Sequence, residues 1–336
     1  MDSQHILVTG GCGFIGSNFV RYTLSSSPHR ITNIDKLTYA GNLENLKGLE
    51  NEPRYRFFRG DIARKPDIEK VFDGVDAVIN FAAESHVDRS IIDPDAFVNT
   101  NIYGTYTLLE QARKTGIKRF LQVSTDEVYG SLGSTGKFRE ETPLAPNSPY
   151  SASKASADMI AMAYYKTFGL PVVITRCSNN YGPYQFPEKL IPLLISNALE
   201  GRDLPIYGDG LNVRDWIHVN DHCAALALAL EKGKPGSIYN VGAENERNNL
   251  EIVELILQIL DKPKSLIKYV KDRPGHDRRY AIDNTKIRNE LGFRVSVPFK
   301  TGMEETVRWY VENRSWWERI KTGEYLDYYE KWYGGR

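Results

Sequence analysis

Five residues near the middle of the chain carry chemical groups that a purely structural segment does not need. Thr125, Asp126 and Glu127 are consecutive and follow a short apolar run, and Tyr150 and Lys154 come after a loop rich in Gly, Ser and Pro. Tyr150 and Lys154 are four residues apart, so on a helix they share one face about a turn apart. We therefore take these five residues as the candidate catalytic group.

A phenol beside an ammonium group suits removal of a proton from an alcohol. The pKa of Tyr150 must fall from roughly 10 to near 7 for this, which requires about 4 kcal/mol of preferential phenolate stabilisation. Lys154 and a second positive charge in the site could together supply it, and Thr125 could hydrogen-bond the same substrate hydroxyl. Tyr-x-x-x-Lys also arises by chance on amphipathic helices, so the elements around it decide its meaning.

The N-terminal segment predicts a nucleotide-binding turn. A buried strand at residues 6–9 runs into Gly10-x-x-Gly13-x-x-Gly16 and then into a helical segment. Glycine permits a tight turn and a close approach of the backbone to a pyrophosphate at the helix N-terminus. The motif is weak by itself, because such turns also occur with nothing bound.

Asp35 indicates which dinucleotide would bind. It ends the next predicted strand, 35 − 16 = 19 residues after Gly16. At this spacing a carboxylate accepts hydrogen bonds from both ribose hydroxyls of NAD and repels the 2′-phosphate of NADP. We expect NAD, although Lys36 weakens the distinction and Asp35 could instead cap the following loop. Asp61 could likewise accept from the adenine amino group or cap the next helix.

The alternation of strands and helices predicts the fold. Further strands are expected at residues 30–34, 54–58, 77–83, 119–124, 172–175 and 237–241, and long helices at 95–115, 151–168, 221–231 and 250–260. This pattern is typical of an α/β fold with a doubly wound parallel Rossmann sheet, here with a smaller C-terminal substrate-binding lobe. We assign residues 1–178 and about 214–242 to the NAD-binding domain, and about 179–213 and 243–336 to the lobe.

Composition excludes several classes of function. Lys+Arg and Asp+Glu both number 43, and without basic arms or long like-charge runs we expect neither a nucleic-acid nor a membrane partner. Cys12, Cys177 and Cys223 lack metal-ligand spacing, so no metal is expected, and their small number suits a reducing compartment. The chain has no run of about 18 apolar residues. We predict a cytoplasmic protein whose ligand occupies a pocket.

The combination of the glycine turn with Tyr150-x-x-x-Lys154 resembles the extended short-chain dehydrogenase/reductase family, whose members act on nucleotide sugars. Thr125-Asp126-Glu127 narrows the resemblance, because most relatives, epimerases included, are expected to lack the adjacent acid pair. The segments at 35–42, 82–90, 178–183 and 272–277 are similar to those of dTDP-glucose 4,6-dehydratases. The resemblance extends over nearly the whole chain.

The resemblance implies a mechanism. Tyr150, assisted by Thr125, would take the C4 hydroxyl proton while hydride passes to a tightly bound NAD. Glu127 would remove the C5 proton, Asp126 would protonate the departing C6 hydroxyl, and the hydride would return to C6. Two adjacent carboxyls in opposite protonation states require environments that separate their pKa values.

It also implies the binding residues. The expected NAD contacts are Gly10, Gly13, Phe14, Ile15, Gly16, Asp35, Lys36, Leu37, Thr38, Asp61, Ile62, Phe81, Ala82, Ala83, Glu84, Ser85, Thr100, Tyr150, Lys154 and Asn180. The expected nucleotide-sugar contacts are Ser85, Thr125, Asn179, Glu188, Lys189, Pro205, Ile206, Tyr207, Arg214, Asn249, Asp272, Arg273, Pro274, Gly275 and His276.

Other hypotheses remain at this point. Within enzymes they are a dehydratase for UDP-glucose or GDP-mannose, a 4-epimerase and a decarboxylase, of which the last two do not need the acid pair. A non-catalytic NAD-binding sensor belongs to a different class. Small residues along the helix at 151–168 suit close helix packing, so we expect a homodimer through this helix and the one near 95–115, with internal packing as the alternative.

Overall fold

One parallel sheet forms the centre of the molecule. The computed structural model describes residues 3–272 and 275–322. Seven of the described strands pair in the order β3-β2-β1-β4-β5-β6-β10, and every pair is parallel. The strands are β1 (His5–Thr9), β2 (Arg30–Asp35), β3 (Tyr55–Arg59), β4 (Ala77–Asn80), β5 (Arg119–Thr125), β6 (Val172–Cys177) and β10 (Ile238–Val241). The strand order reverses between β1 and β4, and ligands bind at such a switch point.

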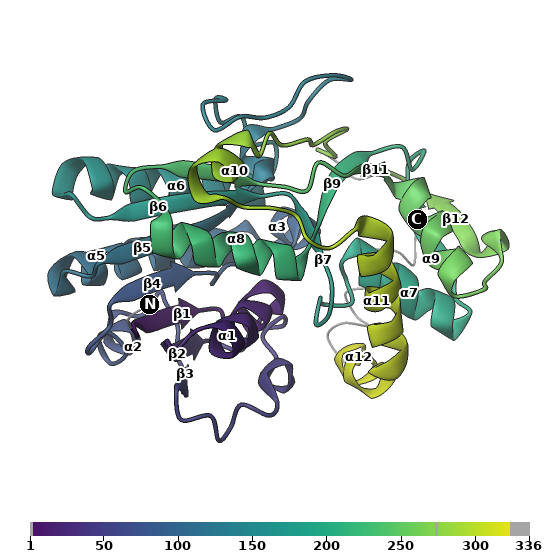
Figure 1. Ribbon diagram of the computed structural model, residues 1–336. Coiled ribbons are helices and arrows are strands. Elements are labelled where there is room, and N and C mark those ends of the chain that lie inside the picture. Colours follow the sequence, from purple (N-terminus) through teal and green to yellow (C-terminus); the bar gives the residue numbers. More distant parts are fainter. Residues whose placement is uncertain (1–2, 273–274, 323–336) are drawn as a thin grey trace.

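Helices cover both faces of this sheet (Figure 1). One face carries α1 (Phe14–Ser26), α8 (Val219–Lys232) and α10 (Thr285–Leu291). The other carries α2 (Lys65–Glu69), α5 (Thr105–Thr115) and α6 (Pro149–Phe168). This two-sided cover explains why the strands are continuous apolar runs rather than alternating ones, and it confirms the predicted fold class.

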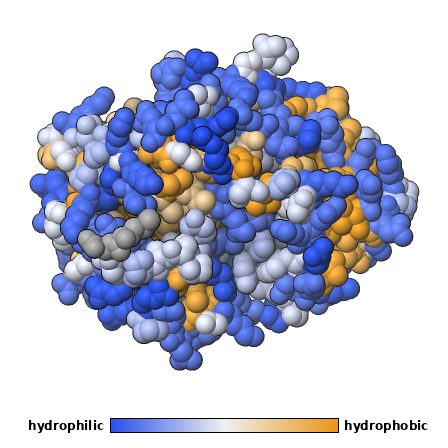
Figure 2. All heavy atoms as spheres, viewed as in Figure 1, coloured by the Kyte–Doolittle hydropathy of each residue, from blue (hydrophilic) through white to orange (hydrophobic). Residues whose placement is uncertain are grey.

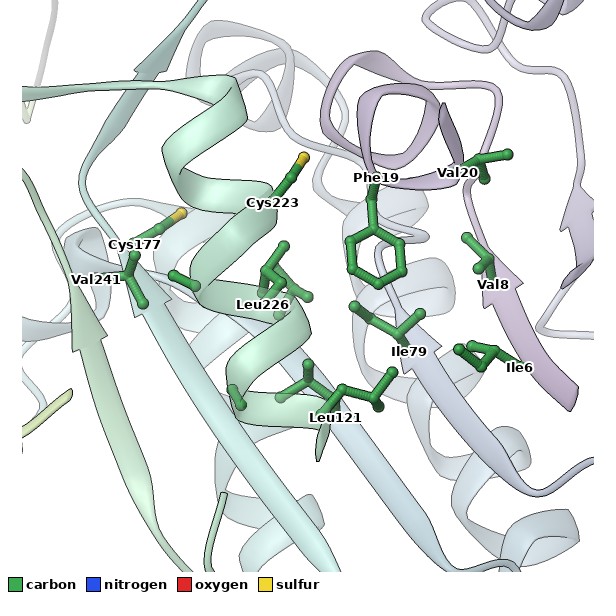
Figure 3. Close-up of a cluster of buried hydrophobic side chains, with 14 of the residues drawn as sticks. Ile6, Val8, Phe19, Val20, Ile79, Leu121, Cys177, Cys223, Leu226 and Val241 are labelled. Carbon is green, nitrogen blue, oxygen red and sulfur yellow. The ribbon is translucent and has the colours of Figure 1, made fainter. Parts of the chain in front are cut away.

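The core between the sheet and its first face is closely packed. Figure 3 shows Phe19 of α1 and Leu226 of α8 pointing toward Ile79 of β4 and Leu121 of β5. All four side chains are almost completely buried, and each contributes roughly 1.5–3 kcal/mol by leaving water. This packing fixes α1, and therefore the glycine turn before it, against the ends of the strands.

The predicted helix at 95–115 is divided in the structure. After α3 (Val87–Ile92), the chain forms α4 (Pro94–Phe97), then the π-helical segment η2 (Val98–Gly104), and only then α5. Gly104 packs closely against Ile62, just before α2. A Cβ added to Gly104 would stand 2.6 Å from the Ile62 side chain. Asn101 is bonded to the backbone of Glu84. The wider turn therefore places Asn101 and Thr100 toward the strand ends, and π-helical turns often occur at functional sites.

A second core lies beside the sheet. Its sheets contain β7 (Asn179–Tyr181), β9 (Val213–His218) and β11 (Glu246–Asn248), and separately β8 (Leu204–Tyr207) and β12 (Ile267–Val270). Its helices are α7 (Leu190–Glu200), α9 (Asn249–Ile259), α11 (Phe299–Glu312) and α12 (Arg314–Ile320). Short 3₁₀ turns complete the described elements: η1 (Leu43–Leu46), η3 (Asp126–Tyr129) and η4 (Lys264–Leu266).

Segments from the C-terminal part of the chain also pack against the parallel-sheet part. Ile287 and Leu291 of α10, with Phe293 after it, pack in the core on the first face of the parallel sheet, although they fall within the range expected for the lobe. In addition, Trp316 of α12 donates to Asn45 of η1. The two parts therefore hold each other through long-range contacts.

The surface is mainly polar. Figure 2 shows charged and polar residues over most of one face, with apolar residues in a few patches. Over residues 3–272 and 275–322, no helix has the length and apolar character needed to cross a membrane.

Candidate active site

A cavity of about 320 Å³ opens at the carboxyl ends of the parallel strands. Its wall contains the glycine turn, the ends of β2, β4, β5 and β6, and the N-terminal turn of α6. A second cavity of about 160 Å³ adjoins it toward the second core. Both walls include Glu127, Asn179, Glu188, Lys189 and Trp216, so a long ligand could extend from one cavity into the other.

The glycine turn leaves no room for side chains. Gly10 has φ +70°, and a Cβ there would stand 2.7 Å from the Ala82 nitrogen, while a Cβ on Gly16 would stand 2.3 Å from the Gly10 carbonyl oxygen. The turn and the N-terminus of α1 therefore face the cavity with backbone only, as a pyrophosphate site requires.

Asp35 serves the loop and the cavity together. Its Oδ2 accepts from the Cys12 N–H at 2.9 Å and its Oδ1 from the Leu37 N–H at 2.8 Å. Burial raises its pKa, and these two hydrogen bonds oppose the rise. Because each carboxylate oxygen has a second lone pair, Asp35 can still accept from ribose hydroxyls. Both of the roles considered for this residue are therefore compatible.

Lys36 does not present an unmatched charge at this end of the cavity. Its ammonium pairs with Asp61 Oδ2 at 2.8 Å, and Asp61 Oδ1 accepts from the Ala63 N–H. Asp61 caps this turn, whereas α2 starts later, at Lys65. With the Lys36 charge neutralised, the carboxylate of Asp35 disfavours a 2′-phosphate, and the residues present fit NAD.

The catalytic candidates converge from two elements. β5 ends at Thr125, whose Oγ1 accepts from the Glu127 N–H at 3.3 Å and so caps the turn η3. Tyr150 and Lys154 lie in the first two turns of α6. That helix begins with Pro149 and a capping box in which Ser148 and Ser151 bond each other's backbone N–H, an arrangement that fixes a helix start. The five candidates thus come from the end of β5, the turn after it and the first two turns of α6, and all five line the cavity.

Asp126 and Glu127 occupy different environments. Asp126 is 2% exposed, whereas Glu127 is only partly buried. Burial, followed by the nearby charge of Glu127, raises the pKa of Asp126 well above its usual range. Asp126 Oδ2 is buried with no hydrogen-bond partner among the described residues. This environment favours the protonated form of Asp126 over that of Glu127, and such a difference can separate the pair into an acid and a base.

Tyr150 differs from the expectation. Burial, with a further contribution from Glu127, raises the pKa of Tyr150 well above its ordinary value. Lys154 donates to the Val123 carbonyl at 2.6 Å, and burial lowers its pKa. In the protein by itself, desolvation thus outweighs the attraction expected from Lys154, and lowering the phenol's pKa requires an additional positive charge inside the cavity.

Asn101 connects these elements. Its side-chain amide donates to Ser153 Oγ at 2.8 Å and to the Glu84 carbonyl at 3.0 Å, while its oxygen accepts from the Glu84 N–H at 2.9 Å. Ser153 lies between Tyr150 and Lys154 on α6. Through Asn101, the π-helical segment is therefore bonded both to the loop after β4 and to the catalytic helix.

Most predicted binding residues lie on the two cavity walls. Every predicted NAD contact except Leu37 lines the larger cavity; Leu37, at φ +58°, packs against the sheet's core. Ser85 and Thr125 line the larger cavity, Asn179, Glu188 and Lys189 line both, and Pro205, Ile206, Tyr207, Arg214, Asn249 and His276 line the smaller one.

Two predicted substrate residues stand behind this wall. Asp272 Oδ1 bonds His276 Nδ1 at 2.6 Å, so it orients a lining residue, and Gly275 lies next to the Asn147 carbonyl. Arg273 and Pro274 lie outside the described residues.

The smaller cavity has charged and polar groups held in place. Arg214 is buried, donates to the carbonyls of Val213 and Asp277, and stacks on Tyr280 at 4.3 Å from the ring centre. Lys189 donates to the Ser85 carbonyl at 2.8 Å. Such fixed cations suit a phosphorylated ligand.

Sequence reasoning missed an aromatic cover over the larger cavity. Tyr39 lies edge-on to Phe186, and the Arg89 guanidinium stands 3.8 Å from the centre of the Tyr39 ring. Arg89 also pairs with the buried Glu188 at 2.9 Å. Tyr39 lies in the segment 35–42 that carried the family resemblance, but nothing in the sequence indicated that it meets residues about 150 positions later.

The strand order, the glycine turn and the Tyr150–Lys154 pair define an enzyme of the extended short-chain dehydrogenase/reductase type. A model of the GDP-mannose 4,6 dehydratase family matches residues 7–306. A dTDP-glucose 4,6-dehydratase of Streptomyces niveus is 52% identical over 324 residues, 95% of this chain and 96% of that protein. The chain belongs to the family of dTDP-glucose 4,6-dehydratases.

Solved structures agree. The dTDP-glucose 4,6-dehydratase of Bacillus anthracis strain Ames, crystallised with NAD, is 55% identical with a TM-score of 0.89, covering 95% of this chain and 100% of that one. The enzyme of Streptomyces venezuelae, with NAD and dTDP bound, is 51% identical with a TM-score of 0.93, covering 94% and 100%.

Proposed function

We propose that this chain converts dTDP-glucose to dTDP-4-keto-6-deoxyglucose with NAD that is tightly bound and regenerated in each turnover. The observation that carries the proposal is the adjacent pair of a fully buried Asp126 and a partly buried Glu127 on the wall of the cavity that also holds Tyr150 and Lys154. An oxidation alone needs Tyr150 and Lys154. Loss of water needs the acid and the base in addition.

The cofactor would occupy the larger cavity. The glycine turn would face its pyrophosphate, Asp35 its adenine-side ribose, and Ala82 and Ala83 would lie beneath it, as their place at the end of β4 supports. Bound NAD would supply the hydride acceptor for C4 and the hydride donor for C6, and it would add positive charge to the cavity that Tyr150 lines.

Each proton then has a residue to carry it. Tyr150, with Thr125, takes the proton of the C4 hydroxyl as the C4 ketone forms. The ketone acidifies C5, and Glu127 takes the C5 proton. Asp126 donates its proton to the C6 oxygen, the C6–O bond breaks, and water leaves a C5–C6 double bond. Glu127 returns its proton to C5 when C6 is reduced. The proton that Tyr150 took from the C4 hydroxyl is released to solvent and Asp126 takes one up from solvent, so protons and electrons balance over a turnover.

The nucleotide would extend into the smaller cavity. Arg214 and Lys189 are fixed there by backbone carbonyls, and Arg214 is positioned to meet a diphosphate without first being ordered. Arg214 also opposes the rise in the Asp126 pKa, so a diphosphate that partly neutralises Arg214 would favour the protonated acid.

An isotope experiment tests the proposal. The purified protein is incubated with dTDP-glucose carrying deuterium at C4, and UDP-glucose and GDP-mannose are tested in parallel. Deuterium at C6 of a 4-keto-6-deoxy product is expected, with dTDP-glucose converted fastest. Absence of conversion, or product that keeps the label at C4, contradicts the proposal; faster conversion of UDP-glucose contradicts only the choice of nucleotide.

We also propose a homodimer through the side of the molecule formed by α3, η2 and α6. This side exposes Ile92, Val98, Tyr103 and Met159, with Met159 63% exposed. Their elements contact one another, and exposed apolar clusters of this kind are typical of protein interfaces. Met159→Glu should convert a dimer to a monomer in analytical ultracentrifugation, whereas Tyr269→Glu, at an exposed aromatic on β12, should not.

Two further proposals concern the chain as a whole. Three free, buried cysteines support work in a reducing cytoplasm. The separate cores on the parallel sheet and beside it support the division into an NAD-binding domain and a substrate lobe.

A further inference from the structure

A buried ion pair lies behind the catalytic residues and has no part in the proton transfers above. Arg176 Nε contacts Asp158 Oδ2 at 2.9 Å, and the two side chains are 4% and 1% exposed. Asp158 is on α6 and Arg176 is on β6. Neither residue is on the wall of either cavity.

The pair is aligned with Lys154. Residues 150, 154 and 158 follow at intervals of four along α6 and are all buried, so they form one row on the face toward the sheet. Arg176 is paired in register with Ser124, directly before Thr125. Along this row the phenol of Tyr150 is followed by the ammonium of Lys154 and then by the carboxylate of Asp158, which pairs with Arg176 on the neighbouring strand.

The free-energy cost of burying this ion pair indicates that it has a role other than stabilising the fold. Removing two charges from water costs several kcal/mol per ion, and apolar replacements for buried pairs are often neutral or stabilising. Burial of Lys154 has a similar cost, because the residue is 5% exposed and its ammonium donates a hydrogen bond to a neutral group, the Val123 carbonyl. The carboxylate of this neutral pair belongs to the residue one helical turn from Lys154, and it offsets the desolvation of the ammonium without adding net charge.

We propose that Asp158, held by Arg176, is a positioning residue that keeps Lys154 as an ammonium ion against the Val123 carbonyl. The inference rests on the proposed function, since it concerns the protonation state that this chemistry needs. In agreement with this role, the negative charge of Asp158 opposes the lowering of the Lys154 pKa by burial.

The other charged groups around α6 either shift the pKa of Lys154 or Tyr150 in a direction given below, or pair with residues outside this row. From β6, Cys177 also favours the Lys154 ammonium, and from η3 Asp126 and Glu127 act on Tyr150. On the helices that pack against α6, Arg89 pairs with Glu188, and Asp88 accepts a hydrogen bond from Tyr207. Glu110 pairs with Arg113 and accepts a hydrogen bond from Tyr164. Asp95 is exposed.

The test compares Asp158→Asn with the wild type. Loss of the carboxylate should lower the pKa of Lys154 by about one unit, so the alkaline limb of the kcat profile moves to lower pH by about one unit and kcat above that limb falls about tenfold. A titration of the Lys154 Cε resonance in ¹³C-lysine-labelled protein, assigned with Lys154→Arg, reads the same shift without turnover. Asp158→Glu should recover most of the wild-type profile.

Control variants separate this role from general stability. Glu200→Gln breaks the ion pair between Glu200 and the buried Lys321, 2.8 Å in length and beside the second core, and should lower Tm without moving the pH profile. Asp158→Asn/Arg176→Met removes both members of the pair, so Arg176 is not left as an unpaired buried charge. This double variant should shift the profile in the same direction, and it serves as the test if the single variant fails to fold.

The outcomes are distinct. An unchanged Lys154 titration and alkaline limb in a folded Asp158→Asn protein overturn the inference. A wild type that does not convert dTDP-glucose overturns the proposed function instead, and the lysine titration still decides the electrostatic claim.

Discussion

At the scale of single residues, the site depends on the difference between two neighbouring carboxyls. Asp126 is buried beneath the turn that Thr125 caps, and Glu127 faces the junction of the two cavities. One backbone step thus produces two environments, and the difference in solvation assigns acid to Asp126 and base to Glu127.

Glu127→Gln should separate oxidation from elimination. The amide cannot take the C5 proton, so C4 oxidation proceeds and absorbance at 340 nm accumulates while the overall rate falls by about 10²–10⁴. Rapid mixing with dTDP-glucose measures both. Tyr150→Phe is the comparison, since it should abolish the absorbance change as well. A Glu127→Gln enzyme with wild-type overall rate removes Glu127 from the mechanism.

Asp126→Asn should stabilise the fold while impairing catalysis. The folded pKa of Asp126 is raised above its unfolded value, so the wild type is unaffected below the unfolded pKa of about 3.9 and loses stability as pH rises from there toward the folded pKa. The neutral amide avoids this loss, so the variant should be more stable than the wild type at pH 7.

Urea unfolding at pH 4 and pH 7.5 measures the effect, and the advantage of the variant should be larger at pH 7.5. Asp76→Asn is the control of opposite sign, because hydrogen bonds from the His5 N–H and from Lys118 lower the pKa of Asp76. That variant should be less stable than wild type at pH 7.5, with the deficit shrinking at low pH. Equal effects at both pH values for Asp126→Asn count against a buried neutral acid.

At the scale of elements, the start of α6 determines the position of the catalytic pair. The capping box places Tyr150 in the first turn, and the side chain packs edge-on against Phe97 of α4 at 6.2 Å between ring centres. The helix start is therefore more directly connected to the chemistry than the middle of the helix.

Ser148→Ala should cost about 1 kcal/mol of stability and also lower kcat, because the first turn of α6 loses its fixed start. Asn248→Ala removes the matching capping box of α9 and should cost about as much stability. Since α9 carries Asn249 on the wall of the smaller cavity, that variant should raise KM and leave kcat nearly unchanged. Chemical unfolding and steady-state kinetics on both variants check this; equal kcat in the two variants would argue against it.

At the scale of the whole molecule, helix α12 restrains the glycine turn at the cofactor end of the site. Trp316 Nε1 donates to Asn45 Oδ1 at 2.9 Å, and Asn45 Nδ2 donates to the Cys12 carbonyl in the glycine turn at 2.9 Å. Arg319 of α12 pairs with Glu44. A contact 271 residues apart in sequence thus restrains the loop that faces the cofactor.

Trp316→Phe should therefore weaken NAD retention. It leaves the buried Asn45 oxygen without its donor, at a cost of about 1–3 kcal/mol, and loosens the glycine turn. Trp317→Phe removes an equivalent bond, from the indole to the Tyr310 carbonyl at 2.9 Å within the second core, and should cost similar stability only. The NAD content of each protein after dialysis, measured by absorbance following denaturation, compares them, and equal retention speaks against the link.

The fold class and the catalytic candidates could be inferred from the sequence because they depend on local patterns. Apolar runs ending in glycine or a polar residue predicted β1, β2 and β4 within a few residues, and the spacing of four placed Tyr150 and Lys154 on one helical face. The predicted helix at 95–115 failed in its details, because the π-helical segment follows from contacts of Asn101 and Gly104 with residues far away in sequence.

The sequence by itself determined which groups are present, in which order, and on which kind of element: a glycine turn after a strand, an acid pair after another, and a Tyr-x-x-x-Lys helix. Only the tertiary structure decided their protonation, since the pKa values of Asp126, Tyr150 and Lys154 depend on burial and on charges brought from other elements. It also decided that Asp158 and Arg176 lie behind Lys154 and that Trp316 reaches the glycine turn. Solvation and long-range contacts exist only once the chain has folded, so no pattern of neighbouring residues records them.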